Sequence, residues 1–326
     1  MATLKLGTNF NITNPGSYDV DDLATGVVRN ASSTGFTMSD SRGNSVTVSG
    51  TGMGYAADGD WVAGVAHSIT IIKSGQLVLE ATGLSVTGNV DVYDRGYDGI
   101  APGMQAEVAY WLRGNDTISA SSGNEYIRGF GGNDSIQGGA GSDIIDGGSG
   151  TDTAVYAGNA ASYQITKTAS GYTVAGGSDG GDSLLNVERI RFADKAIAND
   201  INGNAGQAYR LYQAAFDRKP DLGGLGAQMN GLDNGMSLLQ ISQNFINSQE
   251  FALRYGANPS NEAFVTQLYA NVLHRTPDAG GYAVQVKALY DGVSRAQLLV
   301  NFSESPENYN ATIVGIQNGI EYTPFA

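Results

Sequence analysis

The N-terminal third of the chain alternates short hydrophobic runs with polar turns, a pattern typical of β-strands. β-branched residues dominate three of these runs, at residues 46–48, 68–72 and 84–87. Clusters of glycine, asparagine and serine separate the runs, as at residues 41–44. We therefore expect residues 1–110 to form an antiparallel, sandwich-like β-domain.

From residue 201 onward, hydrophobic residues recur at intervals of three and four, which predicts amphipathic helices. Three stripes show this spacing: Tyr209, Tyr212 and Phe216; Leu238, Ile241 and Phe245; and Phe264, Leu268 and Val272. Ser237 with Gln240, and Ser294 with Gln297, have the S-x-x-Q spacing of a capping box, which marks a helix start. Residues 201–326 are therefore expected to form an all-α domain.

The helical region contains an internal duplication, in which the pattern that begins at Tyr212 recurs from Tyr269 with a constant offset. The remaining matches pair Arg218, Pro220, Asp221, Gly223, Gly224, Ser237, Phe245, Ser248 and Glu250 with Arg275, Pro277, Asp278, Gly280, Gly281, Ser294, Phe302, Ser305 and Glu307. The simplest interpretation is two copies of one helix-loop-helix unit packed on each other. A ligand site at Arg218 and Arg275 is the alternative.

Between these regions, residues 111–155 repeat every nine residues as G-G-x-G-x-D-x-U-x, where U is a large aliphatic residue. The blocks begin at Trp111, Ala120, Gly129, Gly138 and Gly147. The fourth position is occupied by Gly114, Gly123, Gly132, Gly141 and Gly150. The sixth is acidic throughout, with Asp116, Glu125, Asp134, Asp143 and Asp152, and the eighth holds Ile118, Ile127, Ile136, Ile145 and Ala154.

Each position of the repeat has a physical reason. The glycines permit a reversal of the chain within six residues, and the last three residues form a short strand whose middle side chain points inward. One block is half a coil, so turns two blocks apart stack on the same side. Asp116, Asp134 and Asp152 should then form one column, and Glu125 and Asp143 the other.

Stacked carboxylates of this kind repel one another unless a cation neutralises them. Strands about 4.8 Å apart bring the charges within repulsive distance, at roughly 0.9 kcal/mol per pair in water. Calcium takes oxygen ligands at about 2.3–2.6 Å, so one ion fits between two turns, with glycine carbonyls as further ligands. We expect the segment to be disordered without calcium and ordered with it. Glu125 replaces aspartate and blocks 111 and 120 lack the leading glycine pair, so we expect the first turn and the Glu125–Asp143 site to be weak or empty.

Residues 156–200 return to short strands and are expected to form a β-cap, so that the roll and its cap together span residues 111–200. The stretch 176–180 satisfies G-x-S-x-G, but it lies in a glycine-rich loop rather than between a strand and a helix. A turn is the simplest interpretation, with an extra calcium loop carrying Asp179 and Asp182 as the alternative.

Composition limits the remaining possibilities. The 326 residues carry a formal net charge of −14, which disfavours nucleic acid and anionic membranes as partners. Cysteine is absent, which excludes disulfides and thiolate metal sites. No apolar run is long enough to span a membrane, and no N-terminal signal peptide is visible.

No enzyme motif accounts for the chain. His67 and His274 are the only histidines, and neither lies in H-E-x-x-H, so a zinc protease of that type is excluded. Two acidic clusters, at residues 58–60 and 94–98, are most simply turns, with extra calcium sites as the alternative. We expect no catalytic activity, and the remaining enzyme hypothesis is a carboxylate site within residues 1–110.

Residues 129–155 resemble the RTX, or haemolysin-type, calcium-binding repeats of proteins exported by type I secretion. Residues 181–192 resemble the strand-rich segment that often follows them, and residues 208–319 resemble a helical domain of unknown function frequent in such proteins, with Arg218-Lys219-Pro220-Asp221 and Ser248-Gln249-Glu250-Phe251 as its pattern. The resemblance implies calcium as cofactor, export by the type I secretion machinery, and an uncleaved C-terminal secretion signal.

Taken together, these features predict a multidomain α+β protein, secreted to the extracellular space or the cell surface. The first functional hypothesis is a structural protein that self-assembles there as a homo-oligomer or lattice, such as a surface-layer or matrix subunit. The second is a calcium-dependent adhesin or carbohydrate-binding protein, with a cell-surface polysaccharide as partner.

Overall fold

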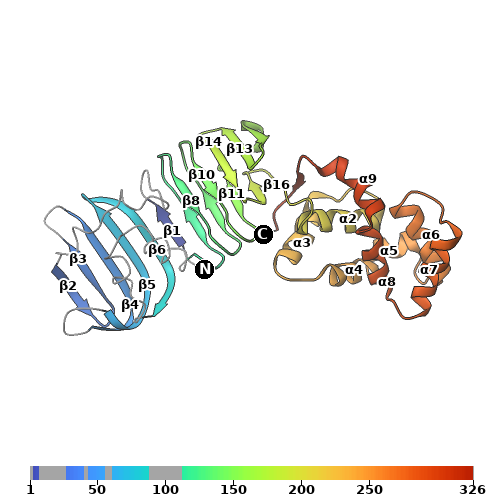
Figure 1. The fold of residues 1–326 in the computed structure, drawn as a ribbon, viewed down its shortest axis with the longest axis horizontal. Helices are drawn as coiled ribbons and strands as arrows, with labels where there is room; N and C mark the ends of the chain where they lie inside the picture. Colours follow the sequence, from blue (N-terminus) through green and yellow to red (C-terminus); the bar gives the residue numbers. More distant parts are fainter. Residues whose placement is uncertain (1–2, 7–26, 40–42, 56–60, 88–111, 326) are drawn as a thin grey trace. The chain divides into compact units, whose positions relative to one another are not determined.

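The structure is a computed structural model that describes residues 3–6, 27–39, 43–55, 61–87 and 112–325 (Figure 1). The chain separates into two compact units, Met1–Ala193 and Asp194–Ala326. Most of the described strands belong to the first unit, where they form sheets, and all of the described α-helices belong to the second. The division into three domains, at residues 110 and 200, stays a prediction.

The N-terminal strands form an antiparallel meander. Its members are β2 (Val27–Ser32), β3 (Gly35–Ser39), β4 (Ser45–Tyr55), β5 (Trp61–Lys73) and β6 (Gln76–Thr87), paired in sequence order. Alternate residues such as Val46 and Val48 are buried, as the two-residue period of a strand requires. In the described residues these strands make a single sheet, so the second layer of the expected sandwich is not seen there.

Strand β1 (Thr3–Leu6) joins the meander to the repeats. It pairs antiparallel with β6 and parallel with β7 (Thr117–Ser119), the first strand of the repeat region. From β7 the pairing continues in parallel through β9 (Ser135–Gln137), β11 (Thr153–Val155) and β15 (Arg189–Arg191). Strand β1 therefore supplies hydrogen bonds to an edge of the repeat region that would otherwise be open.

A second sheet runs along the opposite side of the repeats. Strands β8 (Tyr126–Arg128), β10 (Ile144–Asp146) and β14 (Gly180–Leu185) pair in parallel. The hairpin of β12 (Tyr163–Lys167) and β13 (Gly171–Gly176) then adds to β14 in antiparallel orientation. It caps this sheet, in the segment where the sequence predicted a β-cap.

The two parallel sheets enclose a narrow hydrophobic core made of the eighth-position side chains. These side chains are almost completely buried: Ile118, Ile127, Ile136, Ile145 and Ala154, joined by Leu184 and Ile190. Thr117 lies in register with Ser135, which occupies the same position two blocks later. The arrangement is a parallel β-roll, and two nine-residue blocks make one coil.

The second unit consists of eight described helices and a short strand pair. The helices are α2 (Asn204–Phe216), α3 (Leu222–Asp233), α4 (Leu238–Ile246), α5 (Gln249–Tyr255), α6 (Asn261–Val272), α7 (Ala279–Tyr290), α8 (Arg295–Ser303) and α9 (Pro306–Ile316). β16 (Ala196–Ala198) pairs antiparallel with β17 (Ile320–Tyr322). Within the described residues, no helix is long and apolar enough to span a membrane.

The duplicated residues make equivalent contacts in the two halves of this unit. Arg218 donates to both carboxylate oxygens of Glu250, at 2.8 and 3.1 Å. Arg275 donates to both oxygens of Glu307, at 2.7 and 3.0 Å. Each guanidinium also lies over the ring of a tyrosine, 5.0 Å from the Tyr212 centroid in the first copy. The paired carboxylates account for both arginines, which removes the reason for a ligand site there.

The helix starts expected from the sequence are present, with one difference in detail. The side chain of Ser237 accepts from the backbone of Gln240 and that of Gln240 accepts from the backbone of Ser237, which completes a capping box. Ser294 accepts from the backbone of Gln297 at 3.0 Å, but the Gln297 amide donates instead to Asn301 at 2.8 Å. The second box is therefore only half formed, because a side chain one turn later offers a competing acceptor.

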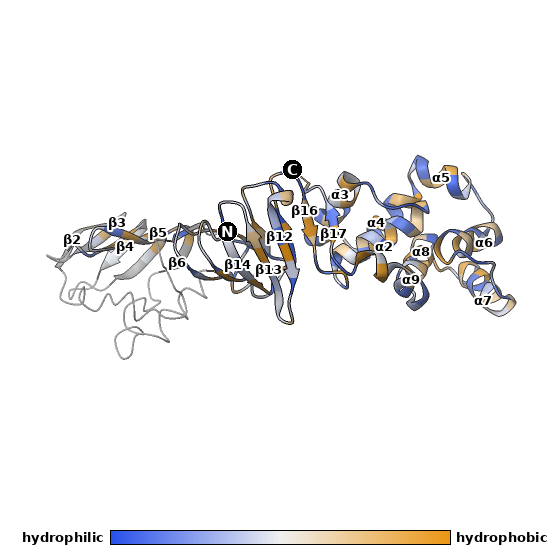
Figure 2. Cartoon of the chain, turned by 90° about the horizontal axis from the view of Figure 1, so that it is seen from above, coloured by the Kyte–Doolittle hydropathy of each residue, from blue (hydrophilic) through white to orange (hydrophobic). Residues whose placement is uncertain are grey.

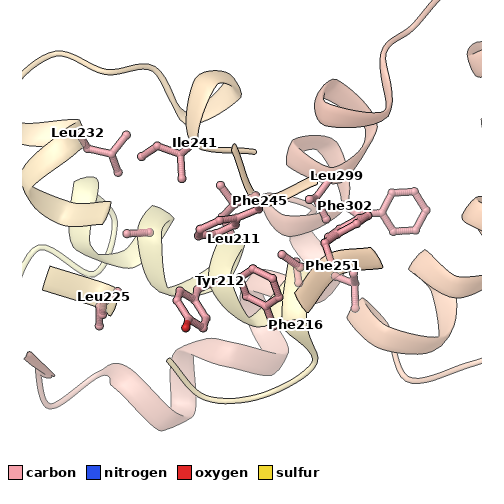
Figure 3. Packing of buried hydrophobic residues seen from close by; sticks show 14 of the residues in the cluster. Leu211, Tyr212, Phe216, Leu225, Leu232, Ile241, Phe245, Phe251, Leu299 and Phe302 are labelled. Atoms are coloured by element: carbon pink, nitrogen blue, oxygen red, sulfur yellow. The ribbon is translucent and has the colours of Figure 1, made fainter. Parts of the chain in front are cut away.

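The core of the helical unit is aromatic and aliphatic. Figure 3 shows Leu211, Tyr212 and Phe216 of α2 beside Phe245 of α4. The Tyr212 ring meets Phe216 and Phe245 edge-on, with centroids 4.9 and 5.4 Å apart. Hydrophobic and hydrophilic residues alternate along the helices in Figure 2, as the intervals of three and four in the sequence predicted.

Candidate calcium site

The acidic residues of the repeats form two columns along the turns of the roll. In the first column the backbone N–H of Asp116 donates to Oδ1 of Asp134, and the N–H of Asp134 donates to Oδ1 of Asp152, both at 2.8 Å. In the second column the N–H of Glu125 donates to Oδ1 of Asp143 at 2.8 Å. Each accepting carboxylate is thus held against the coil that precedes it in its column.

In the three aspartates that accept these bonds, the second carboxylate oxygen is free to bind another ligand. Asp134, Asp143 and Asp152 are buried, and the Oδ2 atom of each has no hydrogen-bond partner. A buried, unsatisfied carboxylate oxygen costs several kcal/mol unless a cation or a proton balances it. The three Oδ2 atoms therefore mark the positions at which a cation would be bound.

Main-chain carbonyls lie beside these oxygens. Oδ2 of Asp134 and the carbonyl oxygen of Gly147 both border the space next to the Cα atom of Gly129. Oδ2 of Asp152 and the carbonyl oxygen of Asn186 border the corresponding space next to Gly147. Each cradle combines a carboxylate with a carbonyl from the following coil, which is the hard-oxygen donor set that calcium prefers.

The fourth-position glycines allow the turns to stack closely. Gly141 and Gly150 have φ angles of 140° and 136°, a region that side chains rarely adopt. A Cβ atom on either residue would also collide with the carbonyl oxygen of Gly123 or Gly132, one coil earlier. These glycines therefore bring the backbones of successive coils together at the turns.

Within the described residues, no three acidic or histidine side chains gather around a single point. The turns therefore do not form a metal site from side chains alone. One or two carboxylates per ion, with main-chain carbonyls completing the shell, agrees with the cradles beside Gly129 and Gly147. The residues present fit calcium, which would neutralise the charge of the columns.

Burial changes the acidity of these carboxyl groups. It raises the pKa of Asp134 to about 8, an effect that the charges of Asp152 and Asp116 reinforce and the backbone N–H of Asp116 opposes. Burial likewise raises the pKa of Asp143 to about 7 and the pKa of Asp152 to about 6. Without a cation, these groups retain protons at pH values where ordinary aspartates are ionised.

The stability of the calcium-free roll is expected to fall as the pH rises from about 5 to 8. The raised pKa values of Asp134, Asp143 and Asp152 mean that the folded state binds more protons than the unfolded state over this range, so raising the pH favours unfolding. Calcium binds the ionised carboxylates, so in the presence of calcium the stability of the roll should rise with pH. Circular dichroism at pH 5 and pH 8, with calcium and with chelator, measures how much of the roll is folded in each condition. Equal calcium-free stability at the two pH values would contradict the assignment.

The substitution Gly147→Ala is expected to weaken calcium binding about tenfold or more, since overpacking typically costs ~1–3 kcal/mol. The new Cβ atom would lie 2.6 Å from Oδ2 of Asp152, inside the cradle. Gly114→Ala is the matched control, because a Cβ atom on Gly114 meets nothing within 4 Å. Calcium titration by calorimetry compares the two variants, and equal affinities would show that the space beside Gly147 is not part of a site.

The structure brings together more acidic residues than the repeats alone contain. Oδ1 of Asp182 accepts from the N–H of Asp143 at 3.0 Å, and Oε2 of Glu188 accepts from the N–H of Asp152 at 2.9 Å. Both residues extend the columns beyond the fifth block. Asp182 belongs to the loop considered above as an extra calcium loop, whereas Glu188 was not singled out. The signal that could have identified Asp182 is the nonapeptide spacing, which resumes at Gly177.

Other residues considered from the sequence have ordinary surroundings. The stretch 176–180 joins β13 to β14, so no helix follows Ser178 and it does not form a nucleophile elbow. The His67 ring contacts the Thr51 hydroxyl at 3.0 Å and the Leu84 carbonyl at 3.3 Å. The acidic clusters at 58–60 and 94–98 lie outside the described residues, as does Trp111.

Comparisons with known proteins agree with the repeat geometry. Residues 112–129 and 119–154 match the RTX calcium-binding nonapeptide repeat, and residues 242–312 match a domain of unknown function, DUF4214. No curated protein matches the sequence. The extracellular lipase LipA from Serratia marcescens is similar at 22% identity over 25% of this chain and 13% of its own, with a TM-score of 0.24. The chain therefore carries RTX nonapeptide repeats, which bind calcium, and a C-terminal DUF4214 domain.

Proposed function

We propose that this chain is a secreted structural protein that folds its β-roll around calcium and self-assembles at the bacterial cell surface. The observation that carries the proposal is the pair of buried carboxylate columns, in which Oδ2 of Asp134, Asp143 and Asp152 has no hydrogen-bond partner. When they are ionised, such columns need a cation to balance their charge, and the very short strands of the roll bury too little surface to fold without it.

The calcium requirement supports a role outside the cell. Proteins with RTX repeats are generally secreted, and extracellular calcium modules bind the ion with dissociation constants of about 10⁻⁴–10⁻³ M. A roll with sites of that strength would stay unfolded at the low calcium concentration inside the cell and fold after export. Calcium would then act as the switch between a chain that is exported and a chain that assembles.

The helical unit offers apolar side chains for assembly. Leu253 of α5, Val284 and Tyr290 of α7, and Val314 of α9 are 64–79% exposed. Large apolar side chains at this exposure are available to contact another molecule. In helix α7 no residue is fully buried, although Val286 and Leu289 pack against the core. We propose that the partner is a second copy of this chain.

Negative-stain imaging and sedimentation of the purified protein, with calcium and with chelator, test the proposal. A lattice or large oligomer that disperses on chelation is the expected result. The double variant Val284→Ser with Val314→Ser should reduce assembly and leave calcium binding unchanged, because both residues lie outside the roll. A protein that stays monomeric at all calcium concentrations and binds a glycan would favour the adhesin hypothesis instead.

A further inference from the structure

The nonapeptide register of the roll resumes after the hairpin insertion. Counting from Gly177 places Gly180 at the fourth position, Asp182 at the sixth and Leu184 at the eighth. Leu184 is 1% exposed, as buried as the isoleucines of the earlier blocks. The segment 177–185 is thus a sixth block, and the insertion 156–176 separates it from the fifth.

The turn of the sixth block stacks on an earlier turn as the matched repeats stack on each other. The N–H of Gly181 donates to the carbonyl of Gly141 at 3.0 Å, and the N–H of Ser183 donates to the carbonyl of Asp143 at 2.8 Å. In the opposite direction, the N–H of Asp143 donates to Oδ1 of Asp182 at 3.0 Å. Asp182 therefore has the relation to Asp143 that Asp143 has to Glu125.

The turn of the fourth block carries a buried oxygen without a hydrogen-bond partner. Oδ1 of Asp143 is held by the preceding coil, whereas its Oδ2 has no partner, and the residue is 1% exposed. In Asp134 the equivalent oxygen lies beside the Gly147 carbonyl, which belongs to the following coil. Oδ2 of Asp143 lies next to the Cα atom of Gly138, as Oδ2 of Asp134 lies next to that of Gly129, and the carboxylate that bonds to the N–H of Asp143 is that of Asp182.

The surroundings of this oxygen are acidic and largely closed to water. Asp182 and Asp179 are both buried, and the hydroxyl of Tyr163, in the hairpin, donates to Oδ2 of Asp179. Burial raises the pKa of Tyr156, and the charges of Asp182, Asp179 and Asp143 raise it further. Buried carboxylates repel one another unless a cation lies among them.

We propose that Asp143 and Asp182 hold a calcium ion across the insertion, so that the turn 177–182 acts as a further calcium-binding turn beyond the matched repeats. The ion would also tie the β12–β13 hairpin to the roll, through Tyr163 and Asp179. This inference depends on the calcium binding of the repeats and is independent of the assembly role proposed above.

The substitution Asp182→Asn tests the site, because the carboxamide oxygen still accepts from the N–H of Asp143 while the charge is lost. Equilibrium dialysis should show one calcium ion fewer per chain than in the wild type. Hydrogen exchange in calcium should show lost protection in the hairpin, residues 163–176, with residues 129–137 still protected. Asp291→Asn, an exposed carboxylate of the helical unit, is the charge-matched control and should behave as the wild type. The same number of bound ions in Asp182→Asn and the wild type would overturn the proposal.

A second measurement covers the case in which Asp182→Asn also loses protection in residues 129–137. Terbium replaces calcium at oxygen-rich sites and emits when a nearby tyrosine is excited. Tyr156→Phe keeps the ring that stacks on Phe192 at 5.5 Å but removes the sensitising phenol. We expect a loss of tyrosine-sensitised emission with the number of bound ions unchanged. Unchanged emission would place no ion beside Asp182, whatever the result of the assembly test.

Discussion

Chelation of calcium is expected to unfold the β-roll while the helical unit stays folded. The sites marked by Oδ2 of Asp134, Asp143 and Asp152 would each lose a bound ion. At a hundredfold excess of calcium over its dissociation constant, one ion contributes about 2.7 kcal/mol, so three contribute about 8 kcal/mol. This equals the whole stability of many domains.

Hydrogen exchange resolved by peptide measures this effect in each unit separately. Residues 117–155 should exchange at the rate of an unfolded chain in chelator and become protected when calcium is added back. The helices of the second unit, with a core around Leu211 and Phe264, contain no part of the acidic columns and serve as the internal control. Protection of 117–155 that is unchanged by chelation at pH 8 would show that the columns do not depend on a cation.

The substitution Asp134→Asn is expected to have opposite effects with and without calcium. Asp134 stands in the middle of its column, so the change affects the sites on both sides of it, and calcium binding by the roll should weaken about a hundredfold, or ~2.7 kcal/mol. In chelator the variant should lose its structure at a higher pH than the wild type, because it removes a buried carboxylate whose pKa is about 8 and whose ionisation favours unfolding.

Calorimetric titration measures the loss of calcium affinity, and circular dichroism in chelator from pH 5 to pH 9 measures the pH at which the roll unfolds. Asp291→Asn again controls for the loss of one negative charge on the chain, since its carboxylate is exposed and pairs with Lys287. A variant that is less stable than the wild type in both conditions would mean that Asp134 acts mainly as a hydrogen-bond acceptor for Asp116 and not as a ligand.

Much of the roll could be predicted because the sequence signals that specify it are local. Each block contains its own turn glycine, acidic residue and inward side chain, as in Gly132, Asp134 and Ile136, and the nine-residue spacing alone specifies which residues share a column. The helix starts and the duplication are local signals of the same kind. The matches at one constant offset indicated two equivalent units, and the structure gives Arg218 and Arg275 equivalent partners.

Other features depended on contacts between residues distant in sequence. Glu250 lies 32 residues after Arg218, and no local pattern shows that the two side chains meet. Strand β1 pairs with Thr117–Ser119, far along the chain, a pairing that strand propensity cannot foresee.

By itself, the sequence determined the repeat, its two acidic columns and the choice of calcium, since these follow from residue type at a fixed spacing. Only the tertiary structure decided that the columns continue to Asp182 and Glu188, which lie 39 and 36 residues after their partners Asp143 and Asp152. The physical reason is that the 156–176 insertion interrupts the spacing but not the stacking. After the insertion, β14 pairs in parallel with β10 and Leu184 is buried in the core, so the sixth block stacks on the fourth although the nine-residue spacing is interrupted.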